Sequence, residues 1–286
     1  MTGGSGKLGR AVVRDLAGHG YDVVNLDLAP PAADAPGDFL RVDLTDYGQT
    51  LQTLTRIEDR YDSVEGVVHL AAVPAPGLVP NTTTFVNNIT ATHHVFAAAR
   101  AAGIRNVVWA SSETVLGLPF ATPPPYIPVD EEYHPRPESS YSLAKTLEEE
   151  MAGQLCRWDP DLKMVGLRFS NVMYPEDYAE FPSFEGDPRA RSWNLWGYID
   201  ARDGAQACRL ALELDAVGRE ILIIANADTV MSTPSADLAA QVYPGVEIRG
   251  EVRGTSTLLS IDKARRVLGY EPQFSWRDEV LPDGGA

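Results

Sequence analysis

The chain has 286 residues, of which 44% are hydrophobic and 22% charged, the composition of an ordinary globular protein with a large buried core. Its formal net charge of −16 argues against nucleic acids and anionic membranes as partners. No apolar run approaches the roughly 18 residues of a membrane span, and Cys156 and Cys208 lack metal or redox spacing. We therefore expect a cytoplasmic protein with two reduced thiols and no bound metal.

The first element is a glycine-rich loop, Thr2–Gly9, in which Gly3, Gly6 and Gly9 are spaced by three. An apolar pattern over Leu8–Ala17 predicts a helix directly after the loop, ending at Gly18-His19-Gly20. Glycine lets the backbone approach a pyrophosphate, and the N-terminus of a helix attracts negative charge. The loop is therefore typical of a dinucleotide site.

The next strand, Tyr21–Asp27, ends on a carboxylate. Asp27 lies at about the distance from the glycines where an acidic residue accepts the adenosine ribose hydroxyls. Because a 2′-phosphate beside a carboxylate is repelled, this position favours NAD over NADP.

A loop of this kind follows a buried central strand, yet only Met1 and Thr2 precede the glycines. We expect either that the stated start is too late or that the N-terminus has been trimmed, and that loss of this strand destabilises the protein.

Strands and helices then alternate along the chain, which predicts right-handed crossovers and a parallel sheet. The expected strands after Asp27 are Phe39–Asp43, Gly66–Ala71, Asn106–Ser111, Lys163–Phe169 and Glu220–Ala225. The expected helices are Thr45–Arg60, Asn81–Ala102, Glu138–Ala152, Ala201–Leu214, Ser235–Gln241 and Ser260–Leu268. Polar candidates fall at the carboxyl ends of strands, where such sheets bind ligands: Asp27, Asp43, Ala71-Ala72, Ser111-Ser112 and Phe169–Asn171.

Two stretches are predicted to have no regular secondary structure. Leu118–Pro137 is rich in proline and aromatic residues and lies between Ser112 and Tyr141, so we expect it to cover the site. Val172–Tyr198 is also irregular and carries Arg189 and Arg191.

The predicted helix Glu138–Ala152 contains Tyr141-Ser142-Leu143-Ala144-Lys145. Positions four apart share one face of a helix, so the Tyr141 hydroxyl and the Lys145 ammonium can point into the same space. A tyrosine is a poor base at neutral pH because its pKa is about 10. A nearby cation favours the phenolate and lowers that pKa, which makes the pair an acid/base catalyst for an alcohol or a carbonyl.

Nearly the whole chain resembles the extended short-chain dehydrogenase/reductases, the NAD-dependent epimerase/dehydratase group. The resemblance is carried by the glycine loop and by Tyr141 with Lys145. Further matching segments are Val68–Ala72, Ser111–Gly117 (similar to SSxxVYG, with Leu116 in place of tyrosine), Leu167–Asn171 and Tyr198–Asp203. It implies an α/β fold, a Rossmann-type doubly wound parallel sheet with a small C-terminal substrate-binding lobe.

The resemblance also implies residue roles. Tyr141 exchanges the proton of the reacting hydroxyl, Lys145 holds the nicotinamide ribose and lowers the Tyr141 pKa, and Ser112 bonds the reacting oxygen. The implied NAD-binding residues are Gly3, Ser5, Gly6, Lys7, Leu8, Gly9, Asp27, Asp43, Leu44, Leu70, Ala71, Ala72, Asn88, Ser111, Tyr141, Lys145, Phe169 and Asn171. The implied substrate residues are Ser112, Asn171, Arg189 and Arg191.

The predicted domains are an NAD-binding domain of residues 1–171, continued by 199–225, and a substrate lobe of residues 172–198 and 226–286. Only Val172–Gly197 separates Asn171 from Tyr198, which is short for a nucleotide-diphosphate pocket and resembles the uronate dehydrogenases of the same family. The favoured reading is therefore an NAD-dependent dehydrogenase of a free sugar, sugar acid or similar small substrate. A UDP-hexose 4-epimerase with tightly held NAD and, behind it, a non-catalytic NAD-binding regulator are the alternatives.

Two further expectations concern partners. Extended family members often pair two helices across a dimer, so we expect a homodimer through Asn81–Ala102 and the Tyr141 helix, where Ala97, Ala98, Ala99, Ala101 and Ala102 would permit close approach. A guanidinium offers a planar fork for a carboxylate or phosphate, so we also expect Arg189 or Arg191 to bind an acidic substrate group. The competing expectation is that both arginines lie on the surface and pair with Glu180, Glu185 or Asp187.

Overall fold

A parallel sheet forms the centre of the computed structural model, which describes residues 1–55 and 63–280. The order of its strands is β2–β1–Thr2–β3–β4–β6–β9, and every pairing is parallel. The strands are β1 (Val24–Asp27), β2 (Asp38–Arg41), β3 (Val67–His69), β4 (Asn106–Ser112), β6 (Lys163–Phe169) and β9 (Gly218–Ile224). The α/β prediction with a parallel sheet is confirmed.

The sequence predicted that the strand before the glycine loop is missing. In the structure Met1–Gly3 takes its place. Thr2 bridges Leu26 of β1 and His69 of β3, and its N–H donates to the Val68 carbonyl at 2.9 Å. The Leu26 N–H donates to the Met1 carbonyl at 2.8 Å. Three residues therefore join the β1–β2 pair to the other four strands and lead directly into the glycine loop.

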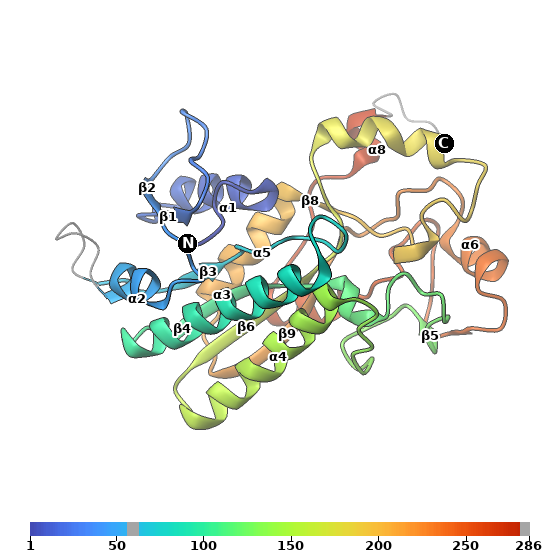
Figure 1. Ribbon diagram of the computed structural model, residues 1–286. Helices are drawn as coiled ribbons and strands as arrows, with labels where there is room; N and C mark the ends of the chain where they lie inside the picture. Colours follow the sequence, from blue (N-terminus) through green and yellow to red (C-terminus); the bar gives the residue numbers. More distant parts are fainter. Residues whose placement is uncertain (56–62, 281–286) are drawn as a thin grey trace.

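Helices cover both faces of the sheet (Figure 1). On one face α1 (Lys7–Gly18) packs against α5 (Ala201–Glu213); on the other, α3 (Asn81–Ala101) packs against α2 (Tyr47–Thr55) and α4 (Ser140–Trp158). Successive strand residues alternate between the two cores, because side chains of a strand point to opposite faces in turn. Val108 and Val165 join the α1–α5 core, whereas Val107 and Met164 join the α2–α3–α4 core. This is the predicted doubly wound arrangement.

The C-terminal elements gather beyond the carboxyl ends of the strands, at the right of Figure 1. The Pro175–Phe184 segment (η2) packs against α8 (Trp276–Val280), with Tyr178, Phe181, Tyr198 and Trp276 in edge-to-face contacts. The remaining elements are η1 (Glu113–Leu116), η3 (Ser192–Asn194), α6 (Ser235–Val242), α7 (Asp262–Leu268) and the short pairs β5 (Tyr126–Ile127) with β10 (Glu247–Ile248) and β7 (Val172–Met173) with β8 (Ile199–Asp200). The division into a cofactor domain and a substrate lobe stays a prediction.

Several expected boundaries were wrong. α4 runs to Trp158 rather than to Ala152, and α2 begins at Tyr47 rather than Thr45; residues 56–60 of the expected Thr45–Arg60 helix lie outside the described residues. Val172–Tyr198, expected to be irregular, contains β7, η2 and η3. Beyond Pro272 the described residues include a short helix, α8. α4 continues through Gly153 to Trp158, and no proline interrupts the chain before Pro160.

Candidate functional site

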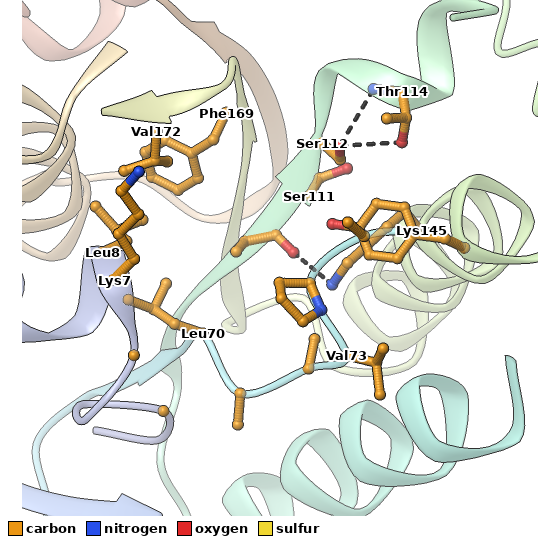
Figure 2. A pocket seen from close by; sticks show the side chains of 18 of the residues that line it. Lys7, Leu8, Leu70, Val73, Ser111, Ser112, Thr114, Lys145, Phe169 and Val172 are labelled. Atoms are coloured by element: carbon orange, nitrogen blue, oxygen red, sulfur yellow. Dashed lines mark hydrogen bonds between the residues drawn. The ribbon is translucent and has the colours of Figure 1, made fainter. Parts of the chain in front are cut away.

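A cavity of about 1020 Å³ opens at the carboxyl ends of β1, β3, β4 and β6. Figure 2 shows Lys7 and Leu8 of α1 with Phe169 and Val172 on one side, and Ser112 with Lys145 of α4 on the other. The predicted cofactor residues that line it are Gly3, Ser5, Gly6, Lys7, Leu8, Gly9, Asp27, Asp43, Leu44, Leu70, Ala71, Ala72, Ser111, Tyr141, Lys145, Phe169 and Asn171, and Ser112 lines it as well. Residues far apart in the chain thus meet at one sheet edge.

The glycine loop is shaped for a dinucleotide. Gly3 has φ +71°, and a Cβ on Gly9 would lie 2.0 Å from the Gly3 carbonyl oxygen, so neither position accepts a side chain. At the start of α1, Gly6 caps the helix without a side-chain hydrogen bond, and the first turn holds no acidic residue. The free N–H groups and positive dipole end of α1 therefore face the cavity and fit a pyrophosphate.

Asp27 lies beside this loop at the end of β1. Its Oδ2 accepts a hydrogen bond from the Ser5 N–H at 3.1 Å, and its Oδ1 accepts one from the Ala29 N–H at 3.1 Å. The carboxylate is held by backbone donors at the cavity edge, in a position that suits a ribose diol.

Ser112, Tyr141 and Lys145 lie together at the other end of the cavity. The start of α4 is fixed by a capping box, in which Ser139 Oγ accepts from the Ser142 N–H at 3.1 Å and Ser142 Oγ accepts from the Ser139 N–H at 2.9 Å. Tyr141 and Lys145 follow on one face of that helix. The N–H and hydroxyl of Thr114 both donate to Ser112 Oγ (Figure 2), which leaves the Ser112 hydroxyl hydrogen free for Tyr141 or a substrate oxygen.

The protonation of Tyr141 differs from the expectation. Burial raises its pKa, and Glu148 and Glu113 act in the same direction, while Lys145 and the Ser112 hydroxyl oppose them. The net direction is upward, so Lys145 does not bring the Tyr141 pKa below its ordinary value.

Two hydrogen-bond acceptors hold the Lys145 ammonium in place. Its Nζ donates to the Ala110 carbonyl at 2.8 Å and to Glu148 Oε2 at 2.9 Å, and the two side chains are 3% and 0% exposed. Burial opposes the ammonium charge, but the adjacent Glu148 outweighs it and raises the Lys145 pKa. The ammonium is therefore charged and pinned at the end of β4.

A second buried carboxyl, Glu113, follows Ser112 and lines the cavity. Ser170 Oγ donates to its Oε2 at 2.6 Å, and Asn194 Nδ2 donates to its Oε1 at 3.2 Å. Burial raises its pKa to about 7, against the opposing effects of these hydrogen bonds and of Arg191. Glu113 therefore changes charge near neutral pH at the Ser112 end of the cavity.

Three predicted site residues do not line the cavity. Asn88 is fully buried; its side chain accepts from the Val73 N–H at 2.8 Å and donates to the Val73 carbonyl at 3.0 Å, which fixes the cavity wall rather than contacting the cavity. Arg189 is exposed. Arg191 is 7% exposed, near Glu113, with its guanidinium against the rings of Phe184 and Trp193. The expectation that both arginines lie on the surface is wrong for Arg191.

Sequence reasoning missed Glu113, Glu148 and the wall from Val73 to Pro76. The signal for Glu148 was available, because it stands three residues after Lys145 on the same helix face. Glu113 could have been noticed as an acidic residue directly after a buried strand. Among the described residues no group of acidic, histidine or cysteine side chains is arranged to hold a metal, and no helix is long and apolar enough to cross a membrane.

Known proteins are similar to this chain in sequence and fold. The family described as NAD dependent epimerase/dehydratase matches residues 1–187. An NAD-dependent glucose-6-phosphate dehydrogenase of Haloferax volcanii is 26% identical, over 99% of this chain and 97% of its own length. A UDP-glucose 4-epimerase of Bacillus subtilis is 27% identical, over 70% of this chain and 59% of its own length. A short-chain dehydrogenase/reductase superfamily protein from Agrobacterium tumefaciens, solved with bound NAD, superposes with a TM-score of 0.72 at 23% identity, over 98% of this chain and 94% of that one.

Proposed function

The chain belongs to the NAD-dependent epimerase/dehydratase family, and we propose that its reaction is NAD-dependent oxidation of a carbinol carbon on a free sugar, sugar acid or sugar phosphate. Membership of this family establishes the enzyme class and identifies NAD as the cofactor. The substrate and the net reaction are the proposal.

One observation favours a small substrate over a sugar nucleotide. Much of the segment Val172–Gly197 is packed into the protein interior. Tyr178, Phe181, Leu195 and Trp196 are buried, and η2 packs against α8. Few residues of the segment are left to enclose a second nucleotide. The near full-length similarity to a dehydrogenase of a sugar phosphate supports the same reading.

Different residues of the chain would bind NAD and act on the substrate. The glycine loop and the N-terminus of α1 would hold the pyrophosphate of NAD, Asp27 would accept the ribose hydroxyls, and Lys145 would lie near the nicotinamide end. Bound NAD accepts or returns the hydride. Ser112 donates a hydrogen bond to the reacting oxygen and holds the carbinol against Tyr141, and Tyr141 takes the hydroxyl proton during oxidation or gives it back during reduction.

A UDP-hexose 4-epimerase is the second candidate, because it uses the same half-reaction forward and back and several curated relatives are epimerases. The two differ in net redox change. We expect purified protein mixed with NAD and a panel of free sugars, uronic acids and sugar phosphates to accumulate NADH. Interconversion of UDP-glucose and UDP-galactose without NADH accumulation would instead support the epimerase.

We also propose a homodimer through α3 and α4. Val86 on α3 and Leu143 and Leu147 on α4 are 53%, 42% and 41% exposed, an apolar set on two adjacent helices. Of the alanines expected at this contact, Ala98 and Ala99 are fully buried in the core, so they would support the interface from behind rather than form it. Both cysteines are free thiols, which suits the cytoplasm as the compartment.

A further inference from the structure

Two consecutive glutamates on α4, Glu148 and Glu149, lie buried behind the catalytic face, and their charges are compensated differently. Glu149 accepts from Arg168 Nε at 2.9 Å and Nη2 at 2.8 Å, and from Ser111 Oγ at 2.6 Å. A guanidinium bound in this bidentate way neutralises Glu149 locally. Among the described residues no arginine is paired with Glu148, and the cation that contacts it is Lys145, at 2.9 Å.

Glu149 acts on Glu148 as a like charge, and the uncharged Thr92 hydroxyl of α3 favours the Glu148 carboxylate. His69 Nε2 lies 3.0 Å from Thr92 Oγ1, and His69 Nδ1 lies 2.7 Å from Thr2 Oγ1. Burial, reinforced by the charge of Lys145, lowers the pKa of His69 to about 3, so this ring carries no charge.

Lys145 is consequently the group that compensates the negative charge of Glu148. The second carboxylate oxygen of Glu148, Oε1, is buried without a hydrogen-bond partner among the described residues. The compensation is mutual. The ammonium that faces Tyr141 is drawn toward Glu148 and the Ala110 carbonyl, and the negative charge of Glu148 cancels part of its field at the phenol.

We propose that Glu148 is a positioning residue that holds the Lys145 ammonium at the end of β4 and offsets its charge at the Tyr141 hydroxyl. The charged and titratable groups that act on Tyr141 are then Lys145 and Glu148 from α4 and Glu113 from η1, with Glu149 paired to Arg168 of β6 and His69 of β3 neutral. A protonated Tyr141 is ready to donate a proton to a carbonyl, and oxidation of a carbinol requires that proton to leave first.

This inference rests on the proposed acid/base role of Tyr141, but its test needs neither substrate nor turnover. The chain has 11 tyrosines, so the tyrosinate absorbance of each protein is measured against pH and the curve of the matching Tyr141→Phe variant is subtracted. The remaining curve gives the midpoint of Tyr141 alone. The proteins compared are the wild type, Glu148→Gln, Glu148→Asp and the control Glu150→Gln, which removes a charge from an exposed position of the same helix.

We expect Glu148→Gln to lower the midpoint of Tyr141 by roughly one pH unit or more, because the Lys145 field is then uncompensated. Glu148→Asp keeps the charge but moves it away from Lys145, so it should lower the midpoint by less, and Glu150→Gln should leave it unchanged. Circular dichroism establishes which variants fold, and if Glu148→Gln does not, Glu148→Asp decides. A folded Glu148 variant with the wild-type midpoint, or a higher one, would overturn the proposal. Absence of NADH production by the wild type would count against the proposed function and leave this measurement intact.

Discussion

Asp27 Oδ2 accepts a hydrogen bond from the backbone N–H of Ser5 at 3.1 Å, which ties the end of β1 to the glycine loop. The carboxylate thereby lies beside the amides that would hold the pyrophosphate. For Asp27→Ala we expect roughly tenfold weaker NAD binding, about 1.4 kcal/mol, and a narrowed or reversed preference over NADP. Titration calorimetry with both cofactors measures this. Asp34→Ala, which removes an exposed carboxylate paired with Arg14, is the control. Tighter binding of NADP than of NAD by the wild type would contradict the assignment of Asp27.

Much of this site followed from the sequence because its determinants are local. The glycine spacing, the helix after it and the acidic end of the next strand specify one sheet edge, and the i, i+4 spacing places Tyr141 and Lys145 on one helix face. Parallel strands separated by helices then bring Ser112 and Asn171 to the same edge. The fold class needs no more than this alternation.

What the sequence could not supply are the pairings between distant elements. Asn194 reaches Glu113 across 81 positions, and Arg168 of β6 reaches Glu149 of α4. Such contacts decide whether a buried carboxyl is neutral, paired or free to act on its neighbours. The direction of the Tyr141 pKa was mispredicted for this reason: the Lys145 effect was visible in the sequence spacing, but burial and the two glutamates were not taken into account.

The exchange of Tyr141 for phenylalanine tests the acid/base assignment. Tyr141→Phe removes only the hydroxyl, so we expect kcat to fall at least about 10²-fold while NAD binding survives. Lys145→Met should damage both NAD affinity and rate, and it also leaves Glu148 buried without its cation, so its stability must be measured in parallel. Steady-state kinetics and NAD titration separate the two variants. Near wild-type turnover in Tyr141→Phe would remove Tyr141 from the chemistry.

The dimer is tested at Leu143, whose side chain is 42% exposed on α4. Leu143→Glu introduces a charge at the centre of the proposed contact, and burying it unpaired is strongly unfavourable. We expect the wild type to be a dimer by light scattering at micromolar concentration and Leu143→Glu to be a monomer. Val217→Glu, at an exposed apolar position that belongs to neither α3 nor α4, should leave the mass unchanged. A monomeric wild type would show that this apolar set has another role.

Glu113 should make stability fall with rising pH. Its pKa is raised by burial from 4.5 to about 7 in the folded protein, so between these values the folded state binds more protons than the unfolded state. Its favourable contribution is fully present below about pH 4.5 and is lost by about pH 7. Relative to Glu113→Gln, the wild type should therefore lose on the order of 1–3 kcal/mol of unfolding free energy across this range. Urea unfolding at several pH values measures the difference, with the exposed Glu132→Gln as control. A difference that does not vary with pH would mean that the Glu113 pKa is the same in the folded and unfolded states.

The last prediction concerns the charge of the substrate. Of the two arginines expected to bind an acidic group, Arg191 is the better placed, because it is buried near Glu113 and stacks on Trp193, which lines the cavity. Its Nε is buried without a hydrogen-bond partner among the described residues. Arg189 is exposed and offers a matched control.

As pH falls through about 7, Glu113 takes up a proton and the Arg191 charge loses its compensating partner. A substrate carboxylate or phosphate should then be held more tightly, so KM for uronic acids or sugar phosphates should fall as pH drops from 8 toward 6 (roughly one unit on each side of the Glu113 pKa). Arg191→Lys keeps the charge but loses the planar fork, and we expect it to lower kcat/KM for the acidic substrates about tenfold or more while sparing neutral sugars. Arg189→Ala should match the wild type. Steady-state rates of NAD reduction with neutral sugars, uronic acids and sugar phosphates decide the matter. A preference for neutral sugars that neither substitution changes would remove the anion site and leave the dehydrogenase proposal standing without it.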